Sequence, residues 1–222
     1  MSVFYGDPIW EKLFSSRSWG KYPSEEAIRF FMYVKKRLGK ESPRALDIGC
    51  GRGAISWFMA KNGAEVSSID GAPSALKDVN SIFREFNVDS TPETVLGDIT
   101  NPAKFLSGKF DIMIDHYSIC HNHREKVINA FSEYSGLMDK GGFIMTCGFG
   151  SKTTDFGNGM HIAGDSFTNS PNGENGTITF FTRDELDSVL EKSGFSIEYH
   201  ENILMDRNGA IIEKMITAGR KI

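Results

Sequence analysis

The sequence predicts an α/β protein: a doubly wound, seven-stranded, mostly parallel sheet that ends in a C-terminal antiparallel β-hairpin. Three observations predict this fold. Short apolar runs alternate with amphipathic stretches from Arg44 onward, a glycine-rich turn follows the first run, and Asn208-Gly209 separates two strand-like segments near the end. The chain has 222 residues, 40% of them hydrophobic and 24% charged, which suits one well-packed domain.

Residues 1–43 are expected to form an N-terminal helical cap. Trp10, Leu13 and Phe14 stand at helical spacing. Ser24 is a favourable N-cap for a second helix, with acidic residues in its first turn, basic residues in its last turns and Gly39 as its end.

Residues 44–147 are expected to form the cofactor-binding core. Strands are predicted at 45–48, 65–69, 94–96, 110–114 and 142–147, with helices at 54–61, 74–86, 103–106 and 124–137. This strict alternation is typical of a parallel sheet covered on both faces, with right-handed crossovers.

Residues 148–178 interrupt the alternation with a polar, glycine-rich segment that is too long for an ordinary connection. Because it follows the carboxyl end of a strand, we expect it to be a substrate lid. Residues 179–222 then complete the single domain. They carry a capping box from Thr182 to Glu185 that opens a helix, and a hairpin with strands near 196–205 and 210–218.

Charge and cysteine content exclude several classes of protein. Lys and Arg total 25 against 29 Asp and Glu, so the formal net charge is −4, which disfavours nucleic-acid binding. Neither an apolar run long enough for a membrane span nor a secretory signal is evident, so a cytoplasmic location is expected. Three unpaired cysteines predict buried thiols rather than disulfides or a zinc site.

The run from Ala45 to Ala54 carries the central motif. Gly49, Cys50 and Gly51 follow an apolar strand, and glycine there allows a tight turn and the close approach of a ligand. Asp70 closes the next strand about 20 residues on, where a carboxylate binds ribose hydroxyls. Together they indicate an adenosine-type cofactor but also satisfy the dinucleotide fingerprint.

Asp47 favours one of these two cofactors. It stands two residues before the first glycine, at the carboxyl end of its strand. A carboxylate there would repel a pyrophosphate and would favour a ligand that carries positive charge. S-adenosylmethionine has a sulfonium and an ammonium and no phosphate. A purely structural Asp47 that binds loop amides is the alternative.

From about residue 40 to residue 222 the sequence resembles the class I S-adenosylmethionine-dependent methyltransferases of the small-molecule type, which have a Rossmann-like fold. Their first motif is similar to Leu46–Gly53, and their sixth and seventh strands are similar to the C-terminal hairpin. The resemblance implies three further cofactor-binding segments at strand ends, namely Asp70-Gly71-Ala72, Gly97-Asp98-Ile99 and Asp115-His116.

Side chains for the acceptor are expected after the fourth strand. His121 is predicted to act as a general base or to orient the acceptor, and His161 in the lid is a second candidate base. Tyr22 is expected to bind the carboxylate of the cofactor, with core packing as the alternative. No metal site is expected, because Asp115, His121 and His123 lack a recognised zinc spacing.

The predicted activity is transfer of the methyl group of S-adenosylmethionine to an O or N atom of a polar small-molecule acceptor, such as a sugar or other metabolite, giving S-adenosylhomocysteine. One alternative is an NAD(P)-dependent oxidoreductase on the same glycine loop. Another is a non-catalytic S-adenosylmethionine-binding protein. Nucleic acid and membrane are not expected as partners, and a homodimer is left open.

Overall fold

The computed structural model describes residues 3–157, 160–163, 166–168 and 176–222. Its main sheet has seven strands in the order β3-β2-β1-β4-β5-β10-β9, and a second sheet has three strands in the order β6-β7-β8. In the main sheet, the first five strands are parallel to one another, and β10 is antiparallel to both of its neighbours. The seven-stranded, mostly parallel sheet with its terminal hairpin is therefore confirmed.

The strands of the main sheet match the predicted runs, with β5, β9 and β10 longer than expected. Their bounds are β1 Arg44–Ile48, β2 Glu65–Asp70, β3 Glu93–Leu96, β4 Phe110–His116, β5 Met138–Phe149, β9 Phe195–Arg207 and β10 Ala210–Lys221. Between β9 and β10, Asn208 and Gly209 both have positive φ (55° and 91°), as a two-residue hairpin turn requires.

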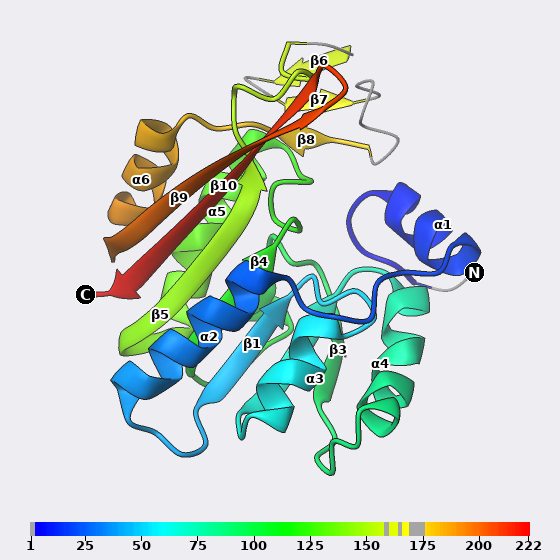
Figure 1. The fold of residues 1–222 in the computed structure, drawn as a ribbon, viewed down its shortest axis with the longest axis vertical. Helices are drawn as coiled ribbons and strands as arrows, with labels where there is room; N and C mark the ends of the chain where they lie inside the picture. The colour runs from blue at the N-terminus through cyan, green and yellow to red at the C-terminus, as the bar shows by residue number, and fades with distance from the viewer. Residues whose placement is uncertain (1–2, 158–159, 164–165, 169–175) are drawn as a thin grey trace.

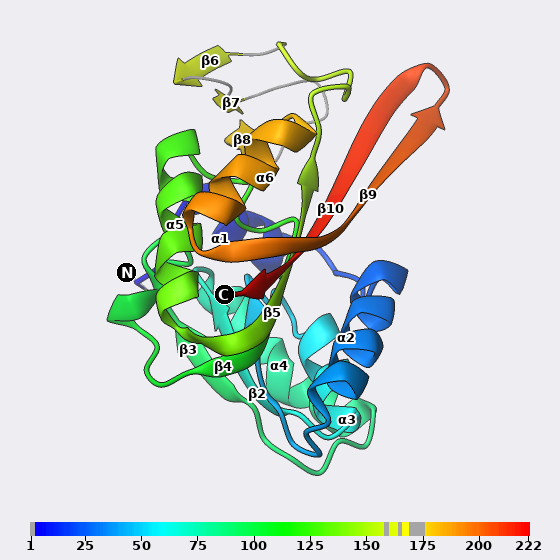
Figure 2. The same ribbon diagram turned by 90° about the vertical axis from the view of Figure 1, so that its left-hand side faces the viewer.

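Helices cover both faces of this sheet. Their bounds are α1 Pro8–Ser16, α2 Glu25–Leu38, α3 Ala54–Lys61, α4 Pro73–Glu85, the short 3₁₀ helix η1 Pro102–Lys104, α5 Arg124–Gly136 and α6 Arg183–Lys192. Figures 1 and 2 show α2 and α3 on one face and α5 and α6 on the other. Two apolar clusters fill these layers, one under α2 and α3 and one under α5 and α6. No helix of the described residues is long and apolar enough to cross a membrane.

Local sequence signals explain where several helices begin and end. Ser24 accepts a hydrogen bond from the backbone of Ala27, and Gly39 ends the same helix in the left-handed conformation (φ 62°). Asp7 caps α1 through a 3.0 Å bond from the backbone of Ile9. The capping box of α6 forms between Thr182 and Glu185, as predicted.

The segment 148–178 holds the smaller sheet, which lies beyond the end of β5 (Figure 1). Its strands are β6 Met160–Ala163, β7 Ser166–Thr168 and β8 Ile178–Thr179. Thr179 joins this sheet to the segment after β4, because its backbone donates to Cys120 (2.8 Å) and its hydroxyl donates to the Asn122 carbonyl (2.6 Å).

The order of strands reverses between β1 and β4, and that point is where open parallel sheets bind ligands. The turn after β1 fits there only because residue 49 is glycine. Gly49 has φ +63°, and a Cβ at this position would lie 2.3 Å from the Cβ of Ser118. The glycine loop and the segment after β4 therefore meet directly.

We expect Gly49→Ala to lower the free energy of unfolding by about 2 kcal/mol more than Gly39→Ala does, because overpacking adds to left-handed backbone strain. The two glycines have nearly the same φ, but a Cβ at Gly39 meets nothing within 4 Å. Denaturant unfolding of both variants measures the difference. Equal losses would show that the contact with Ser118 relaxes at no cost.

Candidate active site

A cavity of about 470 Å³ lies at the carboxyl ends of β1, β2 and β4. Its walls come from the glycine loop, from these strand ends and from residues of the N-terminal segment. Twelve of the predicted site residues line it, namely Tyr22, Asp47, Gly49, Cys50, Gly51, Asp70, Gly71, Ala72, Asp98, Ile99, His116 and His121.

Asp70 ends β2 and holds the glycine loop. Its two carboxylate oxygens accept hydrogen bonds of 2.8 Å from the backbone amides of Gly51 and Ala72. Burial raises its pKa to about 6, and these amide bonds only partly oppose that shift. The loop and the carboxylate are thus fixed to each other at the cavity wall.

Asp47 lies on the neighbouring strand and is 2% exposed. The Ser56 hydroxyl donates to it over 2.5 Å, but burial raises its pKa to about 7, with smaller contributions from Asp70 and Asp115. The alternative role, binding of loop amides, is taken by Asp70 instead. Asp47 is a buried carboxylate that lacks a cationic partner among the described residues.

Acidic groups outnumber basic groups in the part of the cavity lining that the structure describes. Four carboxyl groups line it (Asp7, Asp47, Asp70 and Asp98) against one guanidinium, that of Arg52. Arg52 donates to the backbone carbonyls of Phe14 and Arg17 and pairs with Asp78. A diphosphate would meet net repulsion in this cavity, whereas a sulfonium or ammonium would be stabilised. The residues present therefore fit S-adenosylmethionine.

The N-terminal segment closes one side of the cavity. Tyr5 donates a backbone hydrogen bond of 2.9 Å to Gly71, and a Cβ on Gly71 would lie 2.2 Å from the Tyr5 carbonyl oxygen. The ring of Phe14, on α1, would lie 3.2 Å from a Cβ on Gly51. The sequence predicts a helical cap but not its position on the glycine loop, because no local pattern links residues 5–14 to residues 51 and 71.

A continuous row of rings lines the side of the cavity next to β4 and β5. Ring centroids lie 4.7 Å apart for Trp10 and His121, 5.9 Å for His121 and Phe149, 4.7 Å for Phe149 and Tyr117, and 5.0 Å for Tyr117 and His116. This ring wall is a water-poor surface, and such a surface favours reactions in which positive charge disperses.

His121 is buried within the ring wall. Its Nδ1 has no hydrogen-bond partner within the described part of the chain, and its pKa is lowered to about 4 by burial, against the smaller effect of a backbone hydrogen bond with Thr177. His121 is therefore neutral near pH 7, and its Nδ1 is a buried hydrogen-bond acceptor without a partner among the described residues.

Three predicted site residues lie outside the lining. Gly97 instead gives room to Phe105, whose ring would lie 2.6 Å from a Cβ there. Asp115 is fully buried and accepts hydrogen bonds from Ser118, Ile119 and Thr146, so it fixes the turn after β4. His161 is exposed on β6.

Tyr22 and the cysteines complete the predicted set. Tyr22 is 75% exposed at the cavity edge, with its ring 5.4 Å from that of Phe86. All three cysteines are buried free thiols, as expected. Burial raises the pKa of Cys50, so its side chain stays protonated beside the loop.

Comparison with known proteins shows similarity to methyltransferases. Residues 45–142 match the family model described as a methyltransferase domain. Among curated proteins, the ubiquinone biosynthesis O-methyltransferase of Xylella fastidiosa is 44% identical over 45 residues, which are 20% of this chain. The match spans only 18% of the length of that relative.

Solved structures show the same fold over most of the chain. A structure from Methanosarcina mazei described as an S-adenosylmethionine-dependent methyltransferase has a TM-score of 0.68 at 20% identity, and covers 82% of this chain and 94% of its own. Magnesium protoporphyrin IX methyltransferase from Synechocystis, solved with S-adenosylmethionine bound, has a TM-score of 0.62 at 17% identity. The match covers 89% of this chain and 79% of that protein's chain. Residues 45–142 therefore match a methyltransferase domain, and the chain as a whole shares the fold of these S-adenosylmethionine-dependent methyltransferase structures.

Proposed function

We propose that the protein transfers the methyl group of S-adenosylmethionine to an O or N atom of a polar small molecule. The observation that supports this most directly is the cavity at the ends of β1, β2 and β4. Among the described residues, four carboxyl groups line it, two of them buried (Asp47 and Asp70), against one arginine. Such a lining selects a cationic methyl donor over a pyridine dinucleotide. A glycine loop and an acidic β2 end alone would suit either ligand.

The residues around the cavity have distinct roles in this proposal. Asp70 and the loop at Gly49–Gly51 hold the adenosine part, and Asp47 faces the positive charge. Methyl transfer needs an acceptor atom in line with the methyl group, and positioning alone can supply roughly 7–11 kcal/mol in favourable cases. S-adenosylmethionine supplies the activated methyl group when bound; the protein positions and desolvates it.

His121 orients the acceptor in this proposal rather than taking its proton. A neutral imidazole with a free Nδ1 accepts a hydrogen bond from an acceptor O–H or N–H, but a pKa of about 4 makes it a weak proton acceptor. The segment 148–178 is the proposed lid. Phe149 brings it to the cavity, and Thr179 anchors it beside His121.

S-adenosylmethionine and S-adenosylhomocysteine are expected to raise the melting temperature of the protein by several degrees at 100 times their Kd, which corresponds to about 2.7 kcal/mol. NAD and NADP should produce no rise. Asp70→Asn should remove most of the shift. Asp111→Asn is the matched control, since Asp111 is also buried but pairs with Lys40 at the far end of β4. Stabilisation by NADP alone would refute the proposal.

Asp47→Asn is expected to stabilise the ligand-free protein at pH 8 by about 4 kcal/mol relative to its effect at pH 4. The folded-state pKa of Asp47 is raised to about 7 from 3.8, so the native state holds a proton that the unfolded state releases between these values. Stability of the wild type therefore falls as pH rises through this window, and the variant loses this slope. Denaturant unfolding at both pH values, repeated with S-adenosylmethionine, measures the effect. Parallel pH profiles would contradict it.

His121→Asn should bind S-adenosylmethionine with an affinity within twofold of the wild type, as judged from the thermal shift. It should lower the rate of methyl transfer about tenfold or more, because one hydrogen bond to the acceptor is lost. The measurement is transfer of labelled methyl groups from S-adenosylmethionine into a fractionated metabolite extract. Wild-type transfer by the variant would remove His121 from the acceptor site.

A further inference from the structure

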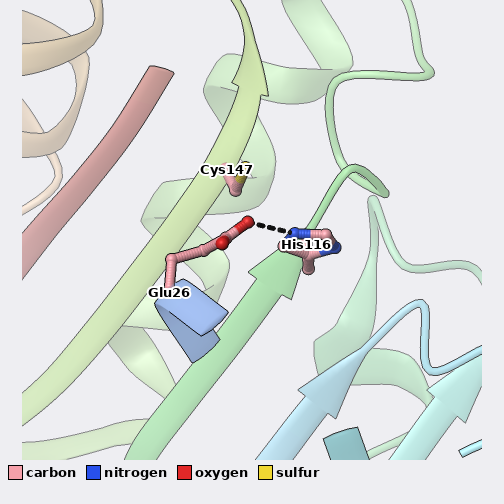
Figure 3. Close-up of side chains that lie close together, drawn as sticks. All are labelled: Glu26, His116 and Cys147. Atoms are coloured by element: carbon pink, nitrogen blue, oxygen red, sulfur yellow. Dashed lines mark hydrogen bonds and ion pairs between the residues drawn. The ribbon is translucent and has the colours of Figure 1, made fainter. Parts of the chain in front are cut away.

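A second histidine of the cavity has a carboxylate partner that the sequence analysis did not identify. His116 is the last residue of β4, and its Nε2 lies 2.8 Å from Oε1 of Glu26. Glu26 belongs to the first turn of α2 and is 6% exposed. Figure 3 shows the two side chains pointing toward each other from the strand end and the helix.

Glu26 is held in its ionised form. Burial alone would raise its pKa, but hydrogen bonds from His116 and Lys214 outweigh burial and hold the pKa below its usual range. The ammonium of Lys214, on β10, lies 2.6 Å from the same Oε1. An ionised carboxylate only accepts hydrogen bonds, so the shared proton must lie on Nε2 of His116.

This arrangement leaves Nδ1 of a neutral His116 with a free lone pair. By the geometry of the imidazole ring, Nδ1 lies away from the nitrogen that bonds Glu26. His116 also lines the cavity, and within the described part of the chain its Nδ1 has no hydrogen-bond partner. The ring wall places His116 on the same side of the cavity as His121.

The two histidines differ in their neighbours. His121 is surrounded by Trp10 and Phe149 and has no carboxylate hydrogen-bonded to its ring in the described chain. His116 is backed by Glu26, which would stabilise an imidazolium. One histidine is thus suited to accept a hydrogen bond, and the other is suited to accept a proton.

We propose that His116 is the general base for an acceptor that carries an O–H or N–H group, and that Glu26 is the positioning residue that fixes its tautomer. This rests on the proposed methyl transfer. The acceptor X–H bond breaks and its proton goes to Nδ1 of His116. The electron pair of X forms the bond to the methyl carbon, and the methyl–sulfur electron pair stays on sulfur. His116 later releases the proton to solvent.

A metal site is the competing interpretation of the same residues. Among the described residues, ligand atoms of Glu26, His116 and Cys147 lie within 4.8 Å of one another. Lys214 already supplies a cation to Glu26, and burial raises the pKa of the Cys147 thiol well above its ordinary value. A protonated thiol and a bound ammonium both oppose a metal ion.

The first test uses His116→Asn and Glu26→Gln, with His123→Asn and Glu25→Gln as matched controls. Glu25 is the exposed neighbour of Glu26, and His123 makes no capping hydrogen bond in α5. All four variants should keep the thermal shift with S-adenosylmethionine. Transfer of labelled methyl groups into the metabolite extract should fall about 100-fold in His116→Asn and about tenfold in Glu26→Gln, and should be unchanged in the controls.

A second measurement needs no acceptor. Nitrogen-15 NMR of histidine-labelled protein, assigned by loss of a signal in His116→Asn, should show His116 protonated at Nε2 and unprotonated at Nδ1. Glu26→Gln should reduce that preference, and Glu25→Gln should not. Protonation at Nδ1 in the neutral ring would overturn the proposal whatever the acceptor is.

The remaining outcomes are also decisive. The proposal is wrong if His116→Asn transfers methyl groups at the wild-type rate, or if the methylated product forms at an atom that loses no proton. It is also wrong if the protein binds one equivalent of zinc and EDTA changes the His116 NMR signals. Absence of a thermal shift with S-adenosylmethionine in the wild type would instead refute the proposed function.

Discussion

Burial of two carboxylates at adjoining strand ends is the constraint on which the site depends. Asp47 and Asp70 lie at the carboxyl ends of β1 and β2, and desolvation of their charges is costly. Backbone amides of the glycine loop and the Ser56 hydroxyl offset part of this cost. The desolvation cost that is not offset raises the pKa of Asp47 to about 7 and the pKa of Asp70 to about 6. A cationic ligand would restore the ionised forms, so the fold holds an electrostatic preference before any ligand arrives.

The two histidines of the cavity also differ in their properties because their surroundings differ. His121 and His116 lie on one wall, yet one is enclosed by rings and the other is paired with Glu26. Glu26 reaches His116 because α2 packs on the face of β4 and β5 with its first turn near the carboxyl end of β4. A helix that also covers the core therefore sets the tautomer of a residue in the site.

Most of the fold could be predicted because its signals are local. Alternating apolar runs, the capping box at Thr182 and the Asn208-Gly209 turn each depend on neighbours in sequence. The cofactor end of the site could also be predicted, since the glycine loop and Asp70 follow strand ends. What the sequence could not show were contacts between distant segments, such as Tyr5 with Gly71 and Glu26 with His116. Nothing in a single sequence links these pairs, so the row of rings and the paired histidine emerged only in three dimensions.

Asp115 lies at a strand end, where the sequence predicts a cofactor-binding residue, but its contacts in the structure are with the protein itself. It ends up buried beneath the turn after β4, where its oxygens accept bonds from Ser118, Ile119 and Thr146. It orders the backbone that carries His116 and His121 rather than facing the cavity. A strand-end carboxylate looks the same in sequence whether it contacts a ligand or supports the residues that do.

The backbone contact between Tyr5 and Gly71 has a practical consequence for handling the protein. Residues close to the amino terminus form part of the cavity wall, where a carbonyl oxygen takes the space that a side chain would need. An insertion or tag placed within residues 3–7 would therefore disturb the cavity wall. One placed in the turn between β9 and β10, at Asn208 and Gly209, would lie outside the cavity lining.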